Sequence, residues 1–326
     1  MLEESPISLE LLNYFDKKYG QLIAPIGLFK SCSITSANLR WPRLSILSVA
    51  PTRQFKSRTS AEMESIFPKE YYIKAGSDFT IHGLARETKG DVNKKCILVD
   101  DGTLLLTSKS KRAKDRLINA MAELLSDGEY KYCDFLRTLG LQGNCTAIVN
   151  MTLESFNRYE NVLLGSTFLE RFLTLFHNMP LVEQRSFIHN KDIKMAMRFD
   201  RKLRISQRTI TNFKRYEEVF KGLAIDFSAL SLRSFLGSFD VVKALAQAHA
   251  SLNQRTKIIQ DDLDAIKLAR DYLINPMSPN ENRIIRLFRQ GKNYTDICLI
   301  LGKEPKSYKP FVSRVVRRAK ERGTID

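Results

Sequence analysis

The stretch Leu44-Ser-Ile-Leu-Ser-Val-Ala50-Pro-Thr-Arg-Gln-Phe-Lys-Ser57 decides the fold class of this chain. Its first half is a short apolar run with β-branched residues, which predicts a buried strand that Pro51 ends. A helical pattern begins near Lys56, so we expect a strand, a loop and a helix in succession. The start of that helix would present free backbone N–H groups, which attract anions.

Two further apolar runs repeat this arrangement. The run Cys96–Asp101 precedes a long helical pattern from about Lys109 to Ser126, and the run Thr146–Asn150 precedes another helical region. Short, fully apolar strands that alternate with helices predict a parallel sheet covered on both faces, and therefore an α/β fold.

The remaining patterns predict four domains. Residues 1–42 contain one amphipathic helix, Leu9–Tyr19, and are expected to form a helical adaptor. Residues 43–180 form the α/β domain. Apolar residues recur only at helical spacing in 181–275, which predicts a helical domain. A break at Asn275-Pro-Met-Ser-Pro279 introduces a small basic domain, 276–326, with 12 Lys and Arg against 5 Asp and Glu.

The charge of the chain limits its possible partners. Its 326 residues include 52 Lys and Arg against 36 Asp and Glu, for a net charge of +16. Such an excess favours a polyanion, although charge alone does not separate nucleic acid from an anionic membrane surface. No apolar run approaches the roughly 20 residues that span a bilayer, and the N-terminus lacks signal-peptide features. We therefore expect a cytoplasmic protein without membrane insertion.

The five cysteines are scattered and lack the spacing of a zinc site, so we expect reduced thiols in the core.

The loop Ala50–Ser57 aligns with the phosphate-binding pattern GxxxxGK[ST], except that Ala50 and Phe55 replace its two glycines. Lys56 would reach the β- and γ-phosphates of a nucleotide, Ser57 would ligate Mg²⁺, and Ala50, Pro51 and Phe55 would line the phosphates. The Cβ of Phe55 penalises a positive φ and crowds the phosphates. A basic strand-to-helix loop without a ligand is the alternative.

Polar groups also end the other two predicted strands. In Ile97-Leu-Val-Asp-Asp101, Asp100 would hold Mg²⁺ and Asp101 would polarise the attacking water. Asp is one methylene shorter than the usual Glu, so slow hydrolysis is expected. Ligands of open α/β sheets lie at the carboxyl ends of the strands, where Ala50, Asp100 and Asn150 should converge. An acid pair that caps a helix is the alternative.

The order Lys56-Ser57, Asp100-Asp101, Asn150 and Phe168-Leu-Glu-Arg-Phe172 resembles the AAA+ ATPases, in particular the branch of minichromosome-maintenance helicases and magnesium chelatases. The resemblance implies a three-layer P-loop AAA+ core with a parallel sheet. It makes Asn150 the sensor 1 residue and Arg171 the arginine finger, which would reach the γ-phosphate bound by the next subunit of a ring-like homo-oligomer. A solvated helix residue is the alternative for Arg171.

The helical domain 181–275 is similar to the lid of that branch, with Arg233 in the place of the sensor 2 arginine and Gln254-Arg255 as an exposed turn. The segment Asp127–Cys145 lies where the family carries a DNA-contacting hairpin. Its aromatic residues, which are Tyr130, Tyr132 and Phe135, are better explained as core residues. We expect no N-terminal oligonucleotide-binding domain like that of the helicases, which argues against processive unwinding.

The basic domain 276–326 predicts three helices, Asn280–Gln290, Tyr294–Leu301 and Ser307–Arg322. The fragment Gly291–Gly302 resembles the helix-turn-helix of LuxR-type regulators and of sigma-factor region four. The resemblance implies that the third helix binds DNA in the major groove. The residues expected at bases or backbone are Ser307, Tyr308, Lys309, Ser313 and Arg314, and those expected at phosphates are Arg317, Arg318 and Lys320. A protein-binding module is the alternative.

These features predict an ATP-dependent, DNA-binding ATPase of the AAA+ type, with ATP and Mg²⁺ as cofactors and a role in DNA replication or its control. Because the loop lacks both glycines, weak Mg²⁺-dependent hydrolysis and no hydrolysis both stay open. The alternative is a non-enzymatic DNA-binding regulator or adaptor on a decayed AAA+ core. A protein that binds RNA or an anionic membrane through its basic tail is a third reading.

Overall fold

The computed structural model describes residues 5–75, 80–103, 106, 111–134, 137–179, 184, 187–188, 191–206, 209–231, 233–273 and 279–321. The chain forms two compact units, Met1–Ile274 and Asn275–Asp326.

The larger unit is built on a five-stranded sheet in the order β2-β3-β6-β1-β7, in which all neighbouring strands are parallel. Its strands are β1 (Ser45–Ala50), β2 (Tyr72–Ala75), β3 (Lys95–Val99), β6 (Cys145–Thr152) and β7 (Phe172–Phe176). All six residues of β1 are buried, as expected for a strand covered on both faces. The predicted α/β class is confirmed.

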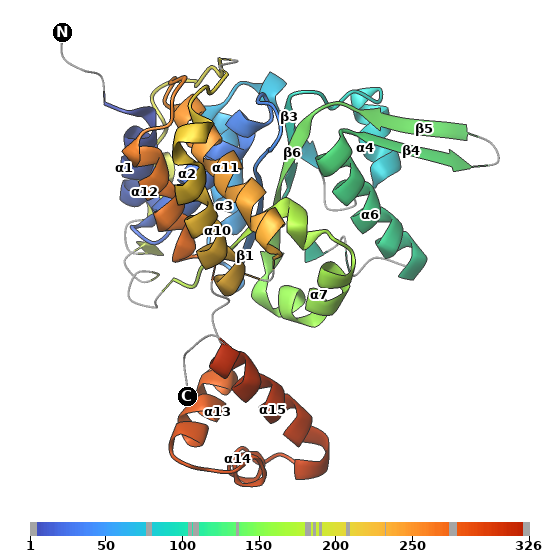
Figure 1. Cartoon of the computed structure of the whole chain (residues 1–326), viewed down its shortest axis with the longest axis vertical. Helices are drawn as coiled ribbons and strands as arrows, with labels where there is room; N and C mark the ends of the chain where they lie inside the picture. Colours follow the sequence, from blue (N-terminus) through green and yellow to red (C-terminus); the bar gives the residue numbers. More distant parts are fainter. Residues whose placement is uncertain are drawn as a thin grey trace. The chain divides into compact units, whose positions relative to one another are not determined.

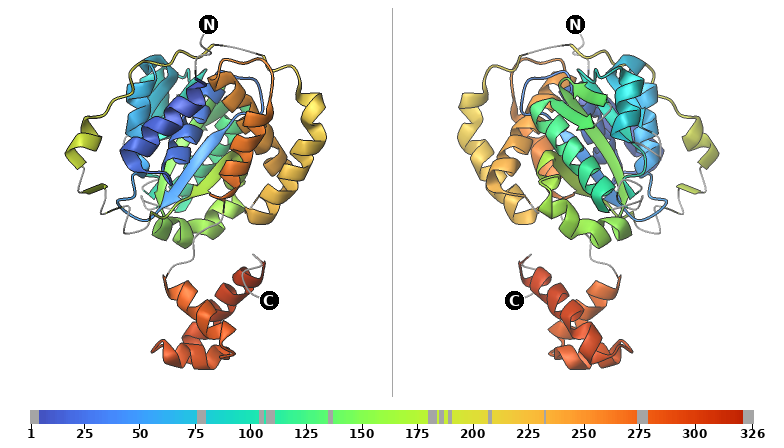
Figure 2. Two further views of the ribbon diagram at one scale, coloured as in Figure 1. Left: turned by 90° about the vertical axis from the view of Figure 1, so that its left-hand side faces the viewer. Right: turned by 90° about the vertical axis from the view of Figure 1, so that its right-hand side faces the viewer.

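Helices cover both faces of this sheet (Figures 1 and 2). Successive side chains of a strand point to opposite faces, and in β1 Ile46 joins one apolar core while Leu47 joins the other. The first core contains α1 (Ile7–Tyr19), α2 (Ala24–Ser36), α3 (Lys56–Ile66), α10 (Glu217–Leu230), α11 (Phe235–Leu252) and α12 (Gln260–Arg270). The second contains α4 (Ile81–Thr88), α6 (Lys111–Asp127) and α7 (Leu153–Gly165).

Residues 1–42, which the sequence set apart as an adaptor, lie within the larger unit. Every residue of α2 is buried, and this helix packs against α1, α11, α3 and the sheet. A helix that is buried on all sides is typical of a core position. The N-terminal segment therefore supplies part of one covering layer of the sheet.

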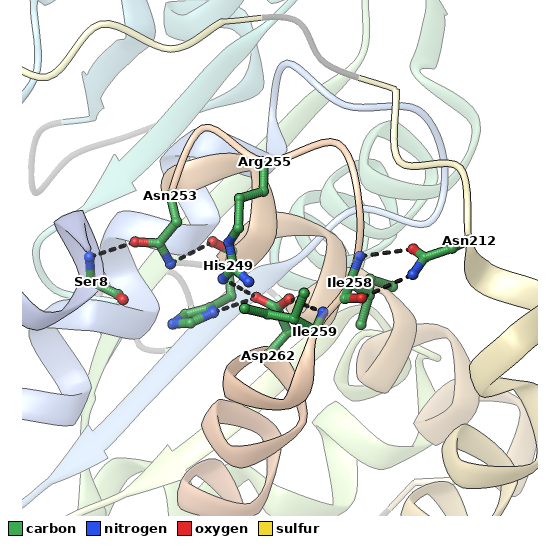
Figure 3. Close-up of polar contacts among 8 residues, drawn as sticks. All are labelled: Ser8, Asn212, His249, Asn253, Arg255, Ile258, Ile259 and Asp262. Carbon is green, nitrogen blue, oxygen red and sulfur yellow. Dashed lines mark hydrogen bonds and ion pairs between the residues drawn. The ribbon is translucent and has the colours of Figure 1, made fainter. Parts of the chain in front are cut away.

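A buried polar network joins the helical region after β7 to the rest of the unit (Figure 3). Asp262 is fully buried, and its carboxylate lies 2.7 Å from Nδ1 of His249 and 2.8 Å from Nη2 of Arg255. The same carboxylate accepts a hydrogen bond from the N–H of Ile259 and so caps α12. Asn253 accepts a hydrogen bond from the N–H of Ser8, at the start of α1.

Two further contacts complete this region. Asn212 exchanges two hydrogen bonds with the backbone of Ile258. The reading of Gln254-Arg255 as an ordinary exposed turn is wrong for Arg255, because its guanidinium reaches the buried Asp262 and its side chain is only 23% exposed.

The remaining short helices are α9 (Lys191–Ala196), η1 (Lys69–Tyr71), η2 (Leu169–Arg171) and η3 (Phe213–Tyr216).

A two-stranded antiparallel hairpin, β4 (Glu129–Asp134) and β5 (Arg137–Gln142), projects beside the main sheet (Figure 1). Its base is fixed by a hydrogen bond from Gln142 N to the Gly90 carbonyl. Tyr130 packs against the core on the α6 side, as one of the two readings of these aromatics expected. The side chain of Tyr132 and the whole of Phe135 lie outside the described residues.

The smaller unit consists of α13 (Pro279–Arg289), α14 (Tyr294–Ile300) and α15 (Pro305–Glu321), which confirms the three predicted helices. Gly291 and Gly302 have φ values of 78° and 65° after the first two helices, a conformation that favours glycine. Asn293 caps α14 by accepting from the N–H groups of Thr295 and Asp296. The core residues are Ile284, Ile285, Ile297, Cys298, Val312, Val315 and Val316.

Among the described residues, none of the helices combines the length and the hydropathy of a membrane-spanning segment. Four of the five cysteines, Cys32, Cys96, Cys145 and Cys298, are buried free thiols, as predicted. The side chain of Cys133 lies outside the described part of the chain.

Candidate nucleotide site

The loop between β1 and α3 contains a backbone conformation that favours glycine, but phenylalanine occupies that position. Phe55 has φ 60° and ψ 7°, in the left-handed region, directly before the first residue of α3. This conformation costs a residue with a Cβ about 1–2 kcal/mol, so packing must offset it. The ring centre of Phe55 lies 4.3 Å from that of Phe187 and 5.3 Å from that of Tyr19. These aromatic contacts hold Phe55 in place.

Lys56 turns back onto the loop. Its ammonium donates hydrogen bonds to the carbonyl oxygens of Ala50 at 2.8 Å and of Pro51 at 2.6 Å. Burial lowers the pKa of Lys56 to about 8, and the negative charge of Asp101 partly opposes that shift. A phosphate would compete with two neutral carbonyls for this cation, and a charged acceptor makes the stronger hydrogen bond.

Ser57 connects the start of α3 to the end of β3. Its hydroxyl donates to the backbone carbonyl of Asp100 at 3.1 Å. Burial raises the pKa of the Asp100 carboxyl, and Lys74 partly opposes this effect. The N–H of Gly102 donates to the carbonyl of Asn150 at 2.6 Å, so the segment after β3 crosses the end of β6. The ends of β3 and β6 and the start of α3 thus adjoin one another.

The donor types at Ser57 and Asp100 suit magnesium. Hydroxyl and carboxylate oxygens are ligands that Mg²⁺ accepts, usually one or two from the protein with the rest from phosphates and water. Within the described part of the chain, no group of three His, Cys, Asp or Glu side chains could hold a metal ion. Because Mg²⁺ usually takes only one or two ligands from the protein, the hydroxyl of Ser57 and the carboxylate of Asp100 fit a metal that arrives with a phosphate ligand.

Asn150 lies beneath the loop. Its side-chain oxygen accepts a hydrogen bond from Lys30, and its NH₂ group donates to Ser60 at 2.9 Å and to the Val99 carbonyl at 3.4 Å. The side chain is 1% exposed. Its amide is therefore satisfied by protein groups, and direct contact with a nucleotide stays a prediction.

An open cavity of about 700 Å³ adjoins the loop, within the range that small-molecule sites occupy. It is lined by the loop residues Arg53 to Arg58 and by Gln184, Phe187 and Ile188.

The two predicted catalytic arginines lie together at a second cavity, of about 330 Å³, which shares no lining residue with the first. Arg233 is buried and donates to the backbone carbonyls of Glu170 and Phe172. Burial lowers its pKa to about 10, and Arg171 adds to this effect while Glu170 and Asp240 oppose it. The Nε atoms of both arginines are buried without a hydrogen-bond partner among the described residues.

The structure thus joins Arg171 to Arg233, and it does not bring either arginine to Lys56. Two exposed apolar side chains, Trp41 and Leu236, also line the arginine cavity.

The predicted DNA-contacting residues lie along α15 of the smaller unit. Ser307, Lys309, Arg314, Arg317 and Lys320 are exposed, whereas Tyr308 and Ser313 are half-buried. The Tyr308 ring packs against Phe311, which explains its partial burial. The side chain of Arg318 lies outside the described residues.

Three further groups around the loop were not predicted from the sequence. Gln54 accepts a hydrogen bond from the N–H of Met179 and donates to Asn178, so it fastens the segment after β7 to the loop. The ring of His177 lies 3.1 Å from the carbonyl oxygen of Gln54. Burial lowers the pKa of His177 to about 3, with Lys30 and Lys56 contributing, so the ring is neutral. The third group is Lys30, the one lysine of the buried helix α2.

No model of a known protein family matches this chain, and no curated protein sequence matches it.

Proposed function

We propose that the larger unit binds ATP with Mg²⁺ at the loop 50–57, that the smaller unit binds DNA, and that the protein is an ATP-dependent, DNA-binding ATPase of the AAA+ type. One observation carries this proposal: Lys56 and Ser57, at the start of α3, adjoin the acids Asp100 and Asp101 that follow β3. A lysine, a hydroxyl and two carboxylates in this arrangement suit a triphosphate with its metal.

The sheet topology supports this location. From β1 the chain continues to β2, β3 and β6 on one side, and it returns to place β7 on the other side. The loop after β1 therefore leaves the carboxyl edge of the sheet where the strand order reverses. Open α/β sheets bind ligands at that point.

Each residue of the loop has a role in the proposal. Lys56 and the free N–H groups of the first turn of α3 would hold the β- and γ-phosphates. Ala50, Pro51 and Phe55 form the wall of the loop. Ser57 and Asp100 would hold Mg²⁺, which when bound neutralises phosphate charge. Asp101 would orient the attacking water, and its short side chain agrees with slow turnover.

Arg171 and Arg233 support the proposal of a ring-like homo-oligomer. Their buried Nε groups lie beside a cavity that no residue of the loop 50–57 lines, and two exposed apolar side chains line that cavity. Such a surface suits a phosphate presented by a neighbouring subunit.

The exposed cations of α15 support DNA as the partner of the smaller unit. Lys309, Arg314 and Arg317 are exposed on this helix, where they could contact DNA phosphates. Ser307 and Ser313, on the same helix, have small polar side chains of a type that contacts base edges. The projecting hairpin β4–β5 offers a further nucleic-acid contact through the exposed Lys131.

A second function is favoured by the packing of the loop itself. Phe55 is held by two aromatic rings, and Lys56 is bonded to its own loop. Both contacts suit a non-enzymatic DNA-binding regulator on a decayed AAA+ core. In that case the protein would shift duplex DNA and retain no labelled ATP with Mg²⁺.

The proposed activity is tested by ATP hydrolysis with and without duplex DNA. We expect slow Mg²⁺-dependent hydrolysis that DNA stimulates and that Lys56→Ala abolishes. Hydrolysis that survives in Lys56→Ala would come from another source and would contradict the proposal. Parallel binding to duplex DNA, RNA and anionic vesicles over a salt series identifies the polyanion.

A further inference from the structure

Lys30 is a buried cation directly beneath the first turn of α3. Its side chain is fully buried, and its ammonium lies within hydrogen-bonding distance of four oxygen atoms. These are the backbone carbonyl of Lys56 at 2.8 Å, the hydroxyls of Thr59 at 2.9 Å and Ser60 at 3.0 Å, and the side-chain oxygen of Asn150 at 2.8 Å.

Burial lowers the pKa of Lys30 well below its ordinary value, Lys56 adds to this effect, and Asp100 opposes it. Burial of a lysine costs free energy unless hydrogen bonds compensate for the lost water. The four partners of Lys30 therefore indicate a specific structural role.

The contact with Lys56 fixes one peptide group of the loop. The Thr59 hydroxyl also lies 2.8 Å from the Lys56 carbonyl, so two donors hold that oxygen towards the interior. A trans peptide is planar, and its N–H points opposite to its C=O. The N–H of Ser57 belongs to the same peptide and therefore points away from Lys30, outwards from the start of α3. The hydrogen bond from Lys30 to the Lys56 carbonyl thus orients the N–H of Ser57, one of the free donors at the start of α3.

The contact with Asn150 adds a second constraint. With its oxygen bound to Lys30, Asn150 directs its NH₂ group to Ser60 and to the Val99 carbonyl. One ammonium therefore links α2, the first turn of α3, and β6 with its neighbour β3. In many phosphate loops glycine permits the required left-handed backbone. Here Phe55 adopts that conformation at a cost in free energy, and Lys30 binds the backbone carbonyl of the next residue, Lys56.

We propose that Lys30 is the positioning residue of the phosphate loop, and that its contacts with Lys56, Thr59 and Asn150 replace the conformational control that the missing glycines provide elsewhere. This inference rests on the proposed function for its consequence, which is tighter binding of polyphosphate. Its structural part, the ordering of the loop, is independent of that function.

The matched variants are Lys30→Met and Lys18→Met. Both remove a fully buried lysine, but Lys18 bonds to Glu62, Tyr14 and the Met197 carbonyl and makes none of the loop contacts above. Hydrogen exchange of the free protein, at a temperature where circular dichroism shows every variant folded, gives the first readout. We expect peptides covering residues 50–60 to exchange at least about tenfold faster in Lys30→Met and to be unchanged in Lys18→Met.

The second readout is affinity for ATP and for inorganic tripolyphosphate, each with Mg²⁺. We expect Lys30→Met to weaken both by a similar factor of about tenfold or more, because the loss lies in the phosphate contacts, and Lys18→Met to stay within about twofold of wild type. If Lys30→Met does not fold, Thr59→Val removes one of the four acceptors and should give smaller changes of the same sign.

Unchanged exchange of residues 50–60 in Lys30→Met, or unchanged affinity in a wild type that binds ATP, overturns the role of Lys30. Faster exchange together with a wild type that binds neither probe would contradict the proposed function while the positioning of the loop stands.

Discussion

The ammonium nitrogen of Lys56 lies 2.8 Å from the carbonyl oxygen of Ala50, so the lysine that begins α3 closes the loop onto the end of β1. A polyphosphate must draw this ammonium away from neutral carbonyls, and only the protonated form offers it a full charge.

The affinity for ATP should therefore depend on the protonation of Lys56. Because burial lowers its pKa to about 8, affinity should be constant below that pH and fall above it, by up to about tenfold per pH unit. Lys56→Arg keeps the charge at every pH used, so its affinity, measured by titration calorimetry from pH 6.5 to 9.5, should be flat over this range. A parallel decline in both proteins would assign the effect to another group.

The left-handed backbone at Phe55 predicts an unusual order of stability. Phe55→Ala and Phe55→Gly both lose the ring contacts with Tyr19 and Phe187, but only glycine relieves the strain. Phe55→Gly should thus be about 1 kcal/mol more stable than Phe55→Ala in urea unfolding. The opposite order is expected at the exposed Ala61 of α3, where Ala61→Gly should cost about 1 kcal/mol. Equal stability of the two Phe55 variants would argue against a strained loop.

His177 should make the protein sensitive to acid. Burial lowers its folded-state pKa to about 3 from the ordinary 6.5, so the unfolded chain binds the proton first and stability is lost as pH falls below about 6.5. Between pH 7 and pH 5 this group should cost about 2 kcal/mol of unfolding free energy. His177→Gln keeps a donor for the Gln54 carbonyl without a titrating ring, and it should remove that part of the loss.

The control is His82→Gln, which makes the same substitution at an exposed position of α4. If His177→Gln loses as much stability as wild type between pH 7 and pH 5, the buried ring is not the cause.

DNA binding through α15 predicts a change in salt dependence. The double variant Lys309→Ala, Arg314→Ala removes two exposed cations from that helix. If both contact phosphates, the slope of log affinity against log salt concentration should fall by about two in fluorescence anisotropy with duplex DNA. Lys292→Ala, at an exposed position before α14, should change the slope less. A double variant with the wild-type slope would place the DNA contact elsewhere.

Much of the sheet follows from the sequence because buried parallel strands are apolar throughout. The strands β1, β3 and β6 are each close to the predicted runs. The strand β2 has only four residues, with Lys74 exposed between buried neighbours, so it leaves no apolar run. The strand β7 follows Arg171 directly, and only its first residue, Phe172, belongs to the predicted arginine motif.

The helix α2 escaped prediction for a different reason. It is buried on every side and therefore shows no amphipathic period, and Pro25 is its second residue. Proline is in fact well accommodated at the first positions of a helix, where its missing N–H is not needed.

The candidate site was only partly visible in the sequence. The spacing of Lys56-Ser57 and Asp100-Asp101 identified two neighbouring loops, because both follow strands of one parallel sheet. Lys30 could not be assigned, because its partners Lys56 and Asn150 are 26 and 120 residues away in the chain. Only the tertiary fold brings such a group to the loop.

The measurement that tests the central claim most directly is the equilibrium binding of ATP, with and without Mg²⁺, to wild type, Lys56→Ala and Lys69→Ala. Lys69 is an exposed lysine of η1, outside both cavities, and serves as the control. We predict Mg²⁺-dependent binding to wild type and Lys69→Ala, and a loss of about 100-fold in Lys56→Ala. A wild type that binds no ATP, or a Lys56→Ala variant that binds it equally well, would contradict the assignment of a nucleotide site to this loop.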